Sequence, residues 1–145
     1  MSSFLGTYSP RLDEKSRLIL PAKFRDRLAS GLVLARGHER CIFVFPSDAF
    51  EALIGDRQAA PLTNKGARDY LRMLLSGASD EIPDKQGRVT IPAHLRQYAE
   101  LERELTVVGV GTHIEIWEPG RWDEFYSAAE EAYVEQSKEV VPGLL

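Results

Sequence analysis

Two short stretches of this chain place an arginine four residues after an aspartate. The first reads DEKSRLILPAKFR over residues 13–25, and the second reads DKQGRVTIPAHLR over residues 84–96. Arginine is suited to recognition of nucleic acid, because its planar fork can donate to O6 and N7 of one guanine together. The same spacing suits an ion pair that braces a surface turn. Both interpretations are open for the two pairs, Asp13 with Arg17 and Asp84 with Arg88.

The two stretches are copies of one another. Pro21 and Pro92 stand at the same place in each, 71 positions apart. A second pair of similar stretches follows in the same order, CIFVFPSDAF at 41–50 and IEIWEPGRWDEF at 114–125. Two collinear blocks in one order indicate an internal duplication.

The charge is unevenly distributed along the chain. The net charge is −4, yet residues 1–40 hold eight Lys and Arg against four Asp and Glu, whereas residues 113–145 hold two against eight. A basic front and an acidic tail favour an anionic partner for the front, although separate solvated faces give the same pattern. If that partner is DNA, Arg17 would read bases, and the flanking Lys15 and Arg11 would contact phosphates. Arg88 and Lys85 form the weaker second set.

Each half is expected to fold as short strands around one short helix. In the first half, strands are predicted at 4–8, 17–20, 32–35 and 41–45, with a helix at 22–29. In the second half, strands are predicted at 82, 89–91, 105–108 and 114–117, with a helix at 92–99. The alternation of apolar residues and the turn-forming Pro and Gly residues support these boundaries.

Three further helices are predicted from their first residues and their apolar spacing. Asp48 with Glu51 predicts a capping box after Pro46. Asn64 predicts a helix start after a linker at 55–63. A last helix over 119–137 carries an apolar stripe and a Glu-rich face, and the stripe is expected in the core or in a subunit contact.

Four short strands cannot cover a core by themselves, so the two halves must share one. Pairing them makes about eight strands, enough to close a small barrel and remove its edges. The sequence therefore predicts an α+β fold with a small closed or partly closed β-barrel, two intertwined halves related by a pseudo-twofold axis, and peripheral helices.

Several classes of function find no support in the residues. No apolar run approaches the roughly 20 residues of a membrane helix, and the N-terminal residues do not resemble a leader, which favours the cytoplasm. His38, His94 and His113 share no metal-ligand spacing, and no nucleophile motif is present. We expect no catalytic residues, no metal, no cofactor and no small-molecule substrate.

The duplicated DxxxR motifs, each followed by a short helix and a strand pair ending in Pro, closely resemble the MraZ family over about residues 5–130. The triplet EIW at 115–117 and the motif GASDEIPDKQGR at 77–88 belong to the same resemblance. It implies two tandem half-barrel modules of the SpoVT/AbrB type. The expected organisation is a first module at 7–54, a linker and connecting helix at 55–77, a second module at 78–124, and a C-terminal helix and tail at 125–145.

The resemblance implies a bacterial DNA-binding transcriptional regulator that is associated with the nucleoid and acts on the promoter of the division and cell-wall gene cluster. It also implies ring-like homo-oligomers that bind short, G-containing direct repeats of double-stranded DNA. Its DxxxR motif falls on Asp13 and Arg17, and on Asp84 and Arg88. The family usually has Gly before the Arg, as at Gly87, but the first copy has Ser16; a positive φ there would strain the turn that aims Arg17.

A protein-interaction module of the antitoxin type is the alternative from another class. It predicts that Arg17→Ala spares function, whereas changes at Trp122 or Phe125 destroy it.

Overall fold

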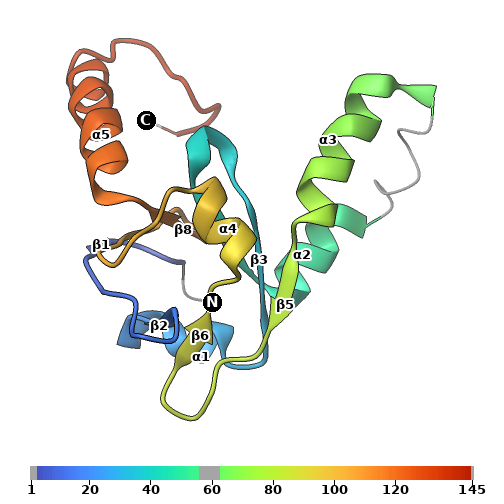
Figure 1. Ribbon diagram of the computed structural model, residues 1–145. Helices are drawn as coiled ribbons and strands as arrows, with labels where there is room; N and C mark the ends of the chain where they lie inside the picture. The colour runs from blue at the N-terminus through green and yellow to red at the C-terminus, as the bar shows by residue number, and fades with distance from the viewer. Residues whose placement is uncertain (1–2, 56–62, 145) are drawn as a thin grey trace.

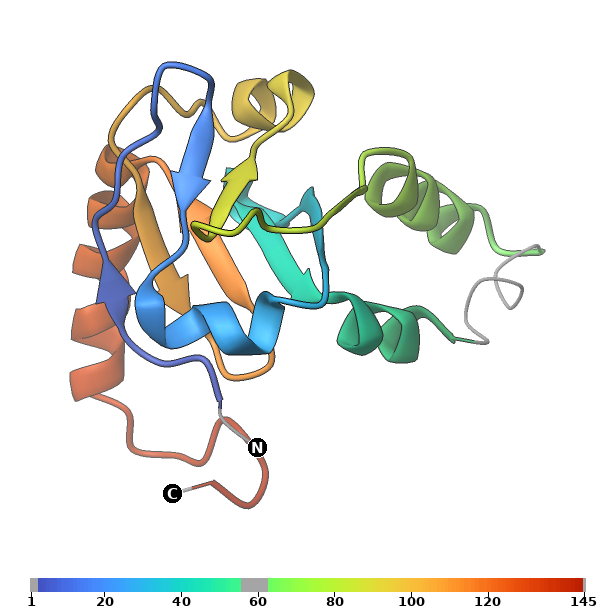
Figure 2. The ribbon, with the colours of Figure 1, turned by 90° about the horizontal axis from the view of Figure 1, so that it is seen from below.

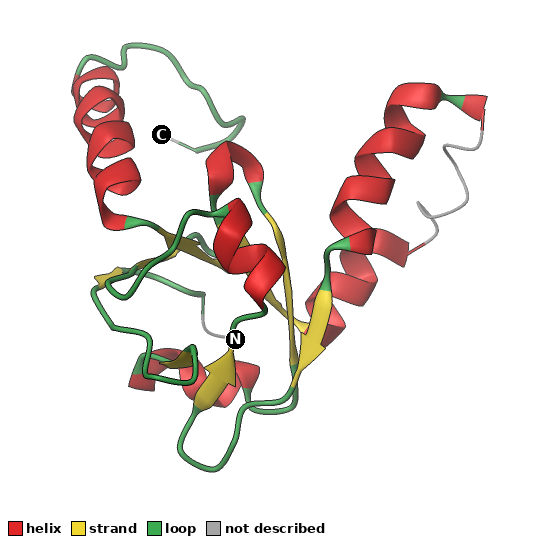
Figure 3. Cartoon of the chain, in the orientation of Figure 1, coloured by secondary structure: helices red, strands yellow, loops and turns green. Residues whose placement is uncertain are grey.

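The computed structural model describes residues 3–55 and 63–144, so most of the linker expected at 55–63 lies outside the described residues. The protein is α+β, as predicted (Figures 1 and 3). The first half contains β1 (Thr7–Tyr8), β2 (Arg17–Ile19), α1 (Ala22–Leu28), β3 (Leu32–Arg36), a short 3-10 helix (His38–Arg40), β4 (Ile42–Pro46) and α2 (Ser47–Ile54). The rest contains α3 (Lys65–Ser76), β5 (Ser79–Glu81), β6 (Arg88–Thr90), α4 (Ala93–Tyr98), β7 (Thr106–Gly109), β8 (Ile114–Trp117) and α5 (Pro119–Val134).

The strands form an open six-stranded antiparallel sheet and a separate two-stranded ribbon. The sheet order is β1-β7-β8-β4-β3-β5, and β2 pairs with β6. The two edge strands, β1 and β5, do not pair with each other, so the sheet is not closed into the predicted barrel. Pro21 and Pro92 follow the ribbon strands almost at once, and the chain then enters α1 and α4, which keeps β2 and β6 short and separate from the sheet.

The two halves interleave across the sheet. Strand β1 of the first half pairs with β7 of the second, and β5 of the second half pairs with β3 of the first. The two halves meet at β4 and β8 in the centre of the sheet and again at β2 and β6 in the ribbon. Exchanging the halves leaves this order unchanged, as an approximate twofold axis requires.

One face of the sheet holds the main core beneath the ribbon. Leu18 and Val89 of the ribbon are buried in this core. Helices α1 and α4 lie at its two sides (Figure 2). The buried apolar residues of this core include Phe24, Leu28, Leu34, Ile42, Val44, Ile91, Leu95, Val107, Ile114 and Ile116. The ribbon is therefore attached to the core by its inner face.

The other face of the sheet is covered in two places by the remaining helices. Phe45 packs with Phe50 of α2 and Leu74 of α3, while Trp117 packs with Trp122 of α5. In Figure 1, α5 and the α2–α3 pair stand apart on this face. Both groups of helices leave much of their own surface exposed.

Three details of the predicted elements need correction. Helix α2 begins after Pro46 with no side-chain cap, and the Asp48 carboxylate accepts from Ala49 N, so the capping box is not formed. The predicted strand residue Ile82 lies beyond β5 and is 75% exposed, because Pro83 cannot donate to a neighbouring strand. Helix α5 ends at Val134 rather than at residue 137. The Asn64 cap is confirmed, since its side chain accepts from Ala67 N.

Candidate nucleic-acid interface

The first DxxxR stretch is a tight turn built around one carboxylate. Asp13 Oδ1 accepts from the backbone N–H of Lys15 at 2.8 Å and of Arg17 at 2.9 Å. Its Oδ2 accepts from Arg17 Nε at 2.7 Å. The backbone closes the turn with bonds from Asp13 N to Arg17 O and from Ser16 N to Asp13 O. One side chain thus holds both the turn and the guanidinium group that follows it.

The second DxxxR stretch repeats this arrangement bond for bond. Asp84 Oδ1 accepts from Gln86 N and from Arg88 N, each at 2.9 Å, and Oδ2 accepts from Arg88 Nε at 2.6 Å. Asp84 N donates to Arg88 O, and Gly87 N donates to Asp84 O. The duplication is preserved in the hydrogen bonds as well as in the sequence.

The aspartates leave the outer edge of each guanidinium group available. Among residues 3–55 and 63–144, each of the two guanidinium groups makes its hydrogen bond through Nε. Nη1 and Nη2 have no partner among those residues. The side chains of Arg17 and Arg88 are 26% and 30% exposed. Because the bond at Nε orients the plane of the group, a fork of N–H donors faces solvent in a defined direction.

The ribbon brings the two arginines onto one face. Its antiparallel register pairs three residues of each strand, Arg17 with Thr90, Leu18 with Val89, and Ile19 with Arg88. Successive side chains of a strand point to opposite faces. Since Leu18 and Val89 are buried, Arg17 and Arg88 both face outward, diagonally across the ribbon. Figure 2 shows β2 and β6 side by side over the sheet.

Each turn is held by the other half of the chain. Ile91 N donates to Ser16 O at 3.0 Å, and Leu20 N donates to Gly87 O at 2.9 Å. Each turn precedes its own strand, and the strands are antiparallel, so the turns lie at opposite ends of the ribbon. The exposed Lys15 and Lys85 of these turns therefore flank the two arginines.

Three other basic residues, Arg11, Arg25 and Arg96, have partners within the fold. Arg11 forms an ion pair with Glu104 at 3.1 Å, which offsets its charge at the surface. Arg25 Nε donates to Leu20 O, and Arg96 Nε donates to Ile91 O, so both tie a short helix to the ribbon. The role of Arg96 escaped the sequence analysis, although its position matches that of Arg25 in the other copy.

Ser16 and Gly87 both adopt a positive φ, 60° and 77° respectively. The left-handed conformation is costly for a residue with a Cβ and cheap for glycine. Ser16, which stands in the first copy where the second has glycine, therefore strains the turn that orients Arg17.

Replacement of Ser16 by glycine is expected to stabilise the fold by about 0.5–1 kcal/mol, because relief of the left-handed strain exceeds the added chain entropy of glycine. Urea unfolding of the two proteins measures the difference. Gly87→Ala is the opposite change and should lower the stability of the fold. It would put a side chain at a positive φ, and its Cβ would lie 2.8 Å from Arg25 Nε. Equal stability of Ser16→Gly and the parent would contradict this prediction.

The pKa of Asp13 and of Asp84 lies below the ordinary value of 3.8, mainly because the backbone N–H of Arg17 or Arg88 donates to the ionised carboxylate, with a further contribution from the guanidinium group. A lowered pKa adds stability above the unfolded-state pKa, and this stability is lost as the pH falls through the folded-state pKa. We expect both turns to remain intact through the ordinary aspartate range and to loosen only as the pH falls below it. Carboxyl ¹³C NMR titration, with Asp13→Asn to assign its signal, measures the midpoints; a midpoint above 3.8 would refute this expectation.

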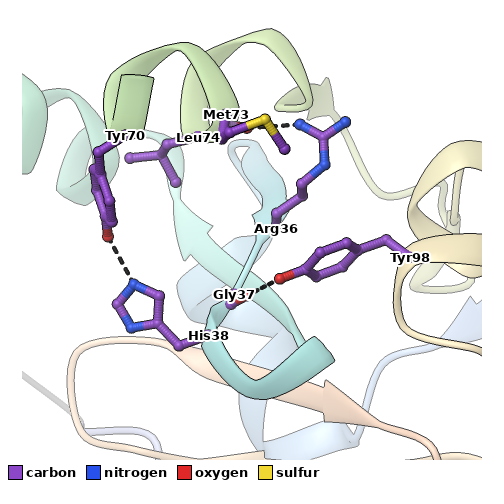
Figure 4. A pocket seen from close by; sticks show the side chains of 7 residues that line it. All are labelled: Arg36, Gly37, His38, Tyr70, Met73, Leu74 and Tyr98. Carbon is purple, nitrogen blue, oxygen red and sulfur yellow. Dashed lines mark hydrogen bonds between the residues drawn. The ribbon is translucent and has the colours of Figure 1, made fainter. Parts of the chain in front are cut away.

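A hollow of about 220 Å³ lies between α3, the β3–β4 turn and α4, where Arg36, His38, Tyr70 and Tyr98 meet (Figure 4). Its polar groups already bond each other. His38 Nε2 lies 2.8 Å from Tyr70 Oη, Tyr98 Oη donates to Gly37 O, and Arg36 Nη1 donates to Met73 O at 2.6 Å. These bonds attach α3 and α4 to the end of β3 and the β3–β4 turn.

In the described part of the chain, no group of three or more His, Cys, Asp or Glu residues is placed to hold a metal ion. None of its helices is long and apolar enough to cross a membrane.

Comparison with known proteins finds relatives that match nearly the whole chain. A family model described as "MraZ protein, putative antitoxin-like" matches residues 3–73 and again residues 74–141. A protein of Micrococcus luteus named Transcriptional regulator MraZ is 60% identical over 141 residues, covering 97% of this chain and 99% of that protein. Proteins of the same name from Kocuria rhizophila and Paenarthrobacter aurescens are each 58% identical, over 97% and 98% of this chain and 99% of their own lengths.

Proposed function

This chain belongs to the MraZ family of transcriptional regulators, and we propose that it regulates by binding double-stranded DNA through the outward face of the β2–β6 ribbon. The observation that carries the proposal is the pair of outward guanidinium groups, Arg17 and Arg88, each held at Nε by an aspartate. The proposed target is the promoter of the division and cell-wall gene cluster, and the proposed location is the nucleoid.

The dimensions of a ribbon suit the major groove, which is about 12 Å wide and admits two antiparallel strands. Arg17 and Arg88 would each donate to O6 and N7 of a guanine with the fork that Asp13 and Asp84 leave free. Lys15 and Lys85, at the two ends of the ribbon, would contact phosphates and set its position along the groove.

A single subunit with a net charge of −4 is a poor ligand for DNA, because affinity comes largely from neutralised phosphates. We therefore propose a ring-like homo-oligomer in which several ribbons meet several direct repeats. Linked contacts of this kind multiply weak affinities. The acidic helix α5 would face away from the DNA.

Two exposed helices of opposite charge support such an assembly. Helix α3 carries three Lys and Arg residues against one Asp, and α5 carries one Arg against four Asp and Glu. Both expose apolar side chains, with Tyr70 and Met73 on α3 and Tyr126 and Tyr133 on α5. A contact between two different surfaces is head-to-tail, and such contacts close into rings when the rotation allows.

Reversal of charge on α3 is expected to weaken the assembly. Arg72→Glu should raise the concentration at which half the protein is assembled by about tenfold, or about 1.4 kcal/mol. The reason is that the new carboxylate would be repelled by the acidic α5 of the next subunit. Light scattering across a dilution series measures this. Glu131→Arg in the same chain should restore part of the mass; an unchanged mass for Arg72→Glu would remove α3 from the contact.

The proposed function is tested by fluorescence anisotropy with the duplex upstream of the protein's own gene. We expect binding that is tighter than for a shuffled duplex and that weakens with salt, with a slope of log K against log salt of about −0.9 for each neutralised phosphate. Equal affinity for both duplexes, or a flat response to salt, would exclude sequence-specific DNA binding.

The alternative, an antitoxin-like module that binds protein, is favoured by the exposed aromatic residues of α5. Trp122 and Phe125 cannot test it, because their rings lie 5.3 Å and 5.4 Å from Trp117 and hold α5 on the sheet. Their loss would disturb the fold under either function. Tyr133, which is 80% exposed, can be changed without such a disturbance of the fold.

A further inference from the structure

The outward face of the ribbon carries two residues besides its arginines, Ile19 and Thr90. We propose that these two side chains contact the C5 methyl groups of thymines next to the guanines read by Arg88 and Arg17, so that the ribbon selects thymine as well as guanine. This inference rests on the proposed function, because it requires the ribbon to lie in the major groove.

Ile19 is an exposed apolar residue on the outer face of the ribbon. Its side chain is 50% exposed, whereas its neighbours Leu18 and Leu20 are each 1% exposed. The register places Ile19 directly opposite Arg88, and Thr90 directly opposite Arg17. Each outward arginine therefore has a methyl-bearing side chain as its cross-strand neighbour.

The internal duplication also places Ile19 and Thr90 at equivalent positions relative to the two arginines. Ile19 and Thr90 are 71 positions apart, the same separation as Arg17 and Arg88, so they occupy equivalent places in the two copies. Both are β-branched, and such side chains are restricted at χ1. Each copy thus holds a methyl group at a defined place on the outer face of its strand.

The spacing of opposite side chains on the ribbon is of the same order as the spacing of neighbouring bases. Side chains directly opposite each other on antiparallel strands have Cβ atoms about 4.5–5.5 Å apart. Neighbouring bases of one strand are separated by about 3.4 Å along the helix axis. An arginine bonded to guanine therefore leaves its cross-strand neighbour within reach of the adjoining base pair.

Thymine is the base that fits this neighbour. In the major groove, its C5 methyl group distinguishes an A·T pair from a G·C pair by an apolar contact, and apolar side chains and the methyl group of threonine are its usual partners. Ile19 has no polar atom in its side chain, so it can favour a methyl group and cannot donate to a guanine or accept from a cytosine.

The test compares the upstream duplex with the same duplex in which uracil replaces every thymine, which removes only the C5 methyl groups. For the parent protein we expect the uracil duplex to bind about fourfold more weakly for each methyl group contacted. Ile19→Ala should weaken binding to the thymine duplex and lose most of the discrimination between the two duplexes. Thr90→Ser, which removes only a methyl group, should lose a smaller part of it.

Val110→Ala is the matched control, because Val110 is a β-branched residue that is 48% exposed and lies outside the ribbon. This variant should prefer the thymine duplex over the uracil duplex to the same extent as the parent protein. Equal binding of both duplexes by the parent, or full discrimination by Ile19→Ala, would overturn the inference while the proposed function stands. Absence of specific binding to the thymine duplex itself would overturn the proposed function, and with it this inference.

Discussion

Arg17→Ala is expected to lose about 1–3 kcal/mol of specific DNA binding for each guanine that the residue contacts, because no other side chain can replace its bidentate fork. In an assembly that engages several repeats, these losses add, so binding to the upstream duplex should fall by more than a hundredfold, or about 2.7 kcal/mol, when two or more contacts are lost. Anisotropy titration at fixed salt measures the change. Unchanged affinity would exclude Arg17 from base recognition.

Arg17→Ala and Arg17→Lys together separate base recognition from the effects of charge and of folding. Arg17→Lys keeps the charge but lacks a second planar donor pair, so it cannot bond Asp13 and guanine together. We expect it to keep its affinity for the shuffled duplex and to lose a large part of its preference for the specific one, the remainder coming from Arg88. The Asp13–Arg17 pair lies at the surface, so either variant should change the free energy of unfolding by about 1 kcal/mol or less. A much larger loss of stability would assign the pair to folding instead.

Leu18→Ala is expected to lower the free energy of unfolding by about 2–5 kcal/mol, since it empties a site in the core directly beneath the ribbon. Leu18 is 1% exposed and lies in the main core with Val89 on the facing strand. The ribbon would lose part of its attachment to the sheet, and DNA binding should weaken as well. Urea unfolding followed by far-UV circular dichroism measures the stability.

Ile19→Ala is the natural comparison, because it alters the next residue of the same strand. Ile19 is half exposed, so its truncation should change the free energy of unfolding by about 0.5 kcal/mol or less. The two variants should thus separate the roles of the inner and outer faces. Similar losses of stability for both would mean that the ribbon does not present a buried and an exposed face in solution.

Local features of the fold were predictable because their bonds join residues close in the chain. The turns at 13–16 and 84–87 depend on an aspartate that bonds backbone N–H groups two and four residues later. A positive φ at Ser16 was raised as a condition, because glycine stands at the equivalent place in the second copy, and φ at Ser16 is 60°. Short helices after Pro21 and Pro92, with Phe24 and Leu28 on the buried face, follow from apolar spacing.

The halves are intertwined, as predicted, but the sheet is open where a closed or partly closed barrel was expected. The sequence did not identify which strands pair between the halves, because these pairings join residues 45 to 101 positions apart. Closure required β1 and β5 to pair, yet both are edge strands of two and three residues. Apolar alternation shows that a strand has a buried face, but it does not identify the partner strand or the register.

The sequence by itself determined that two aspartate–arginine turns exist and how each is built, because the bonds that the two aspartates make span at most four residues. Only the tertiary structure decided that Arg17 and Arg88 share one outward face with Ile19 and Thr90. That face exists because β2 pairs with β6 in a register that turns Leu18 and Val89 inward together, and a shift of one residue in either strand would have placed that strand's arginine in the core.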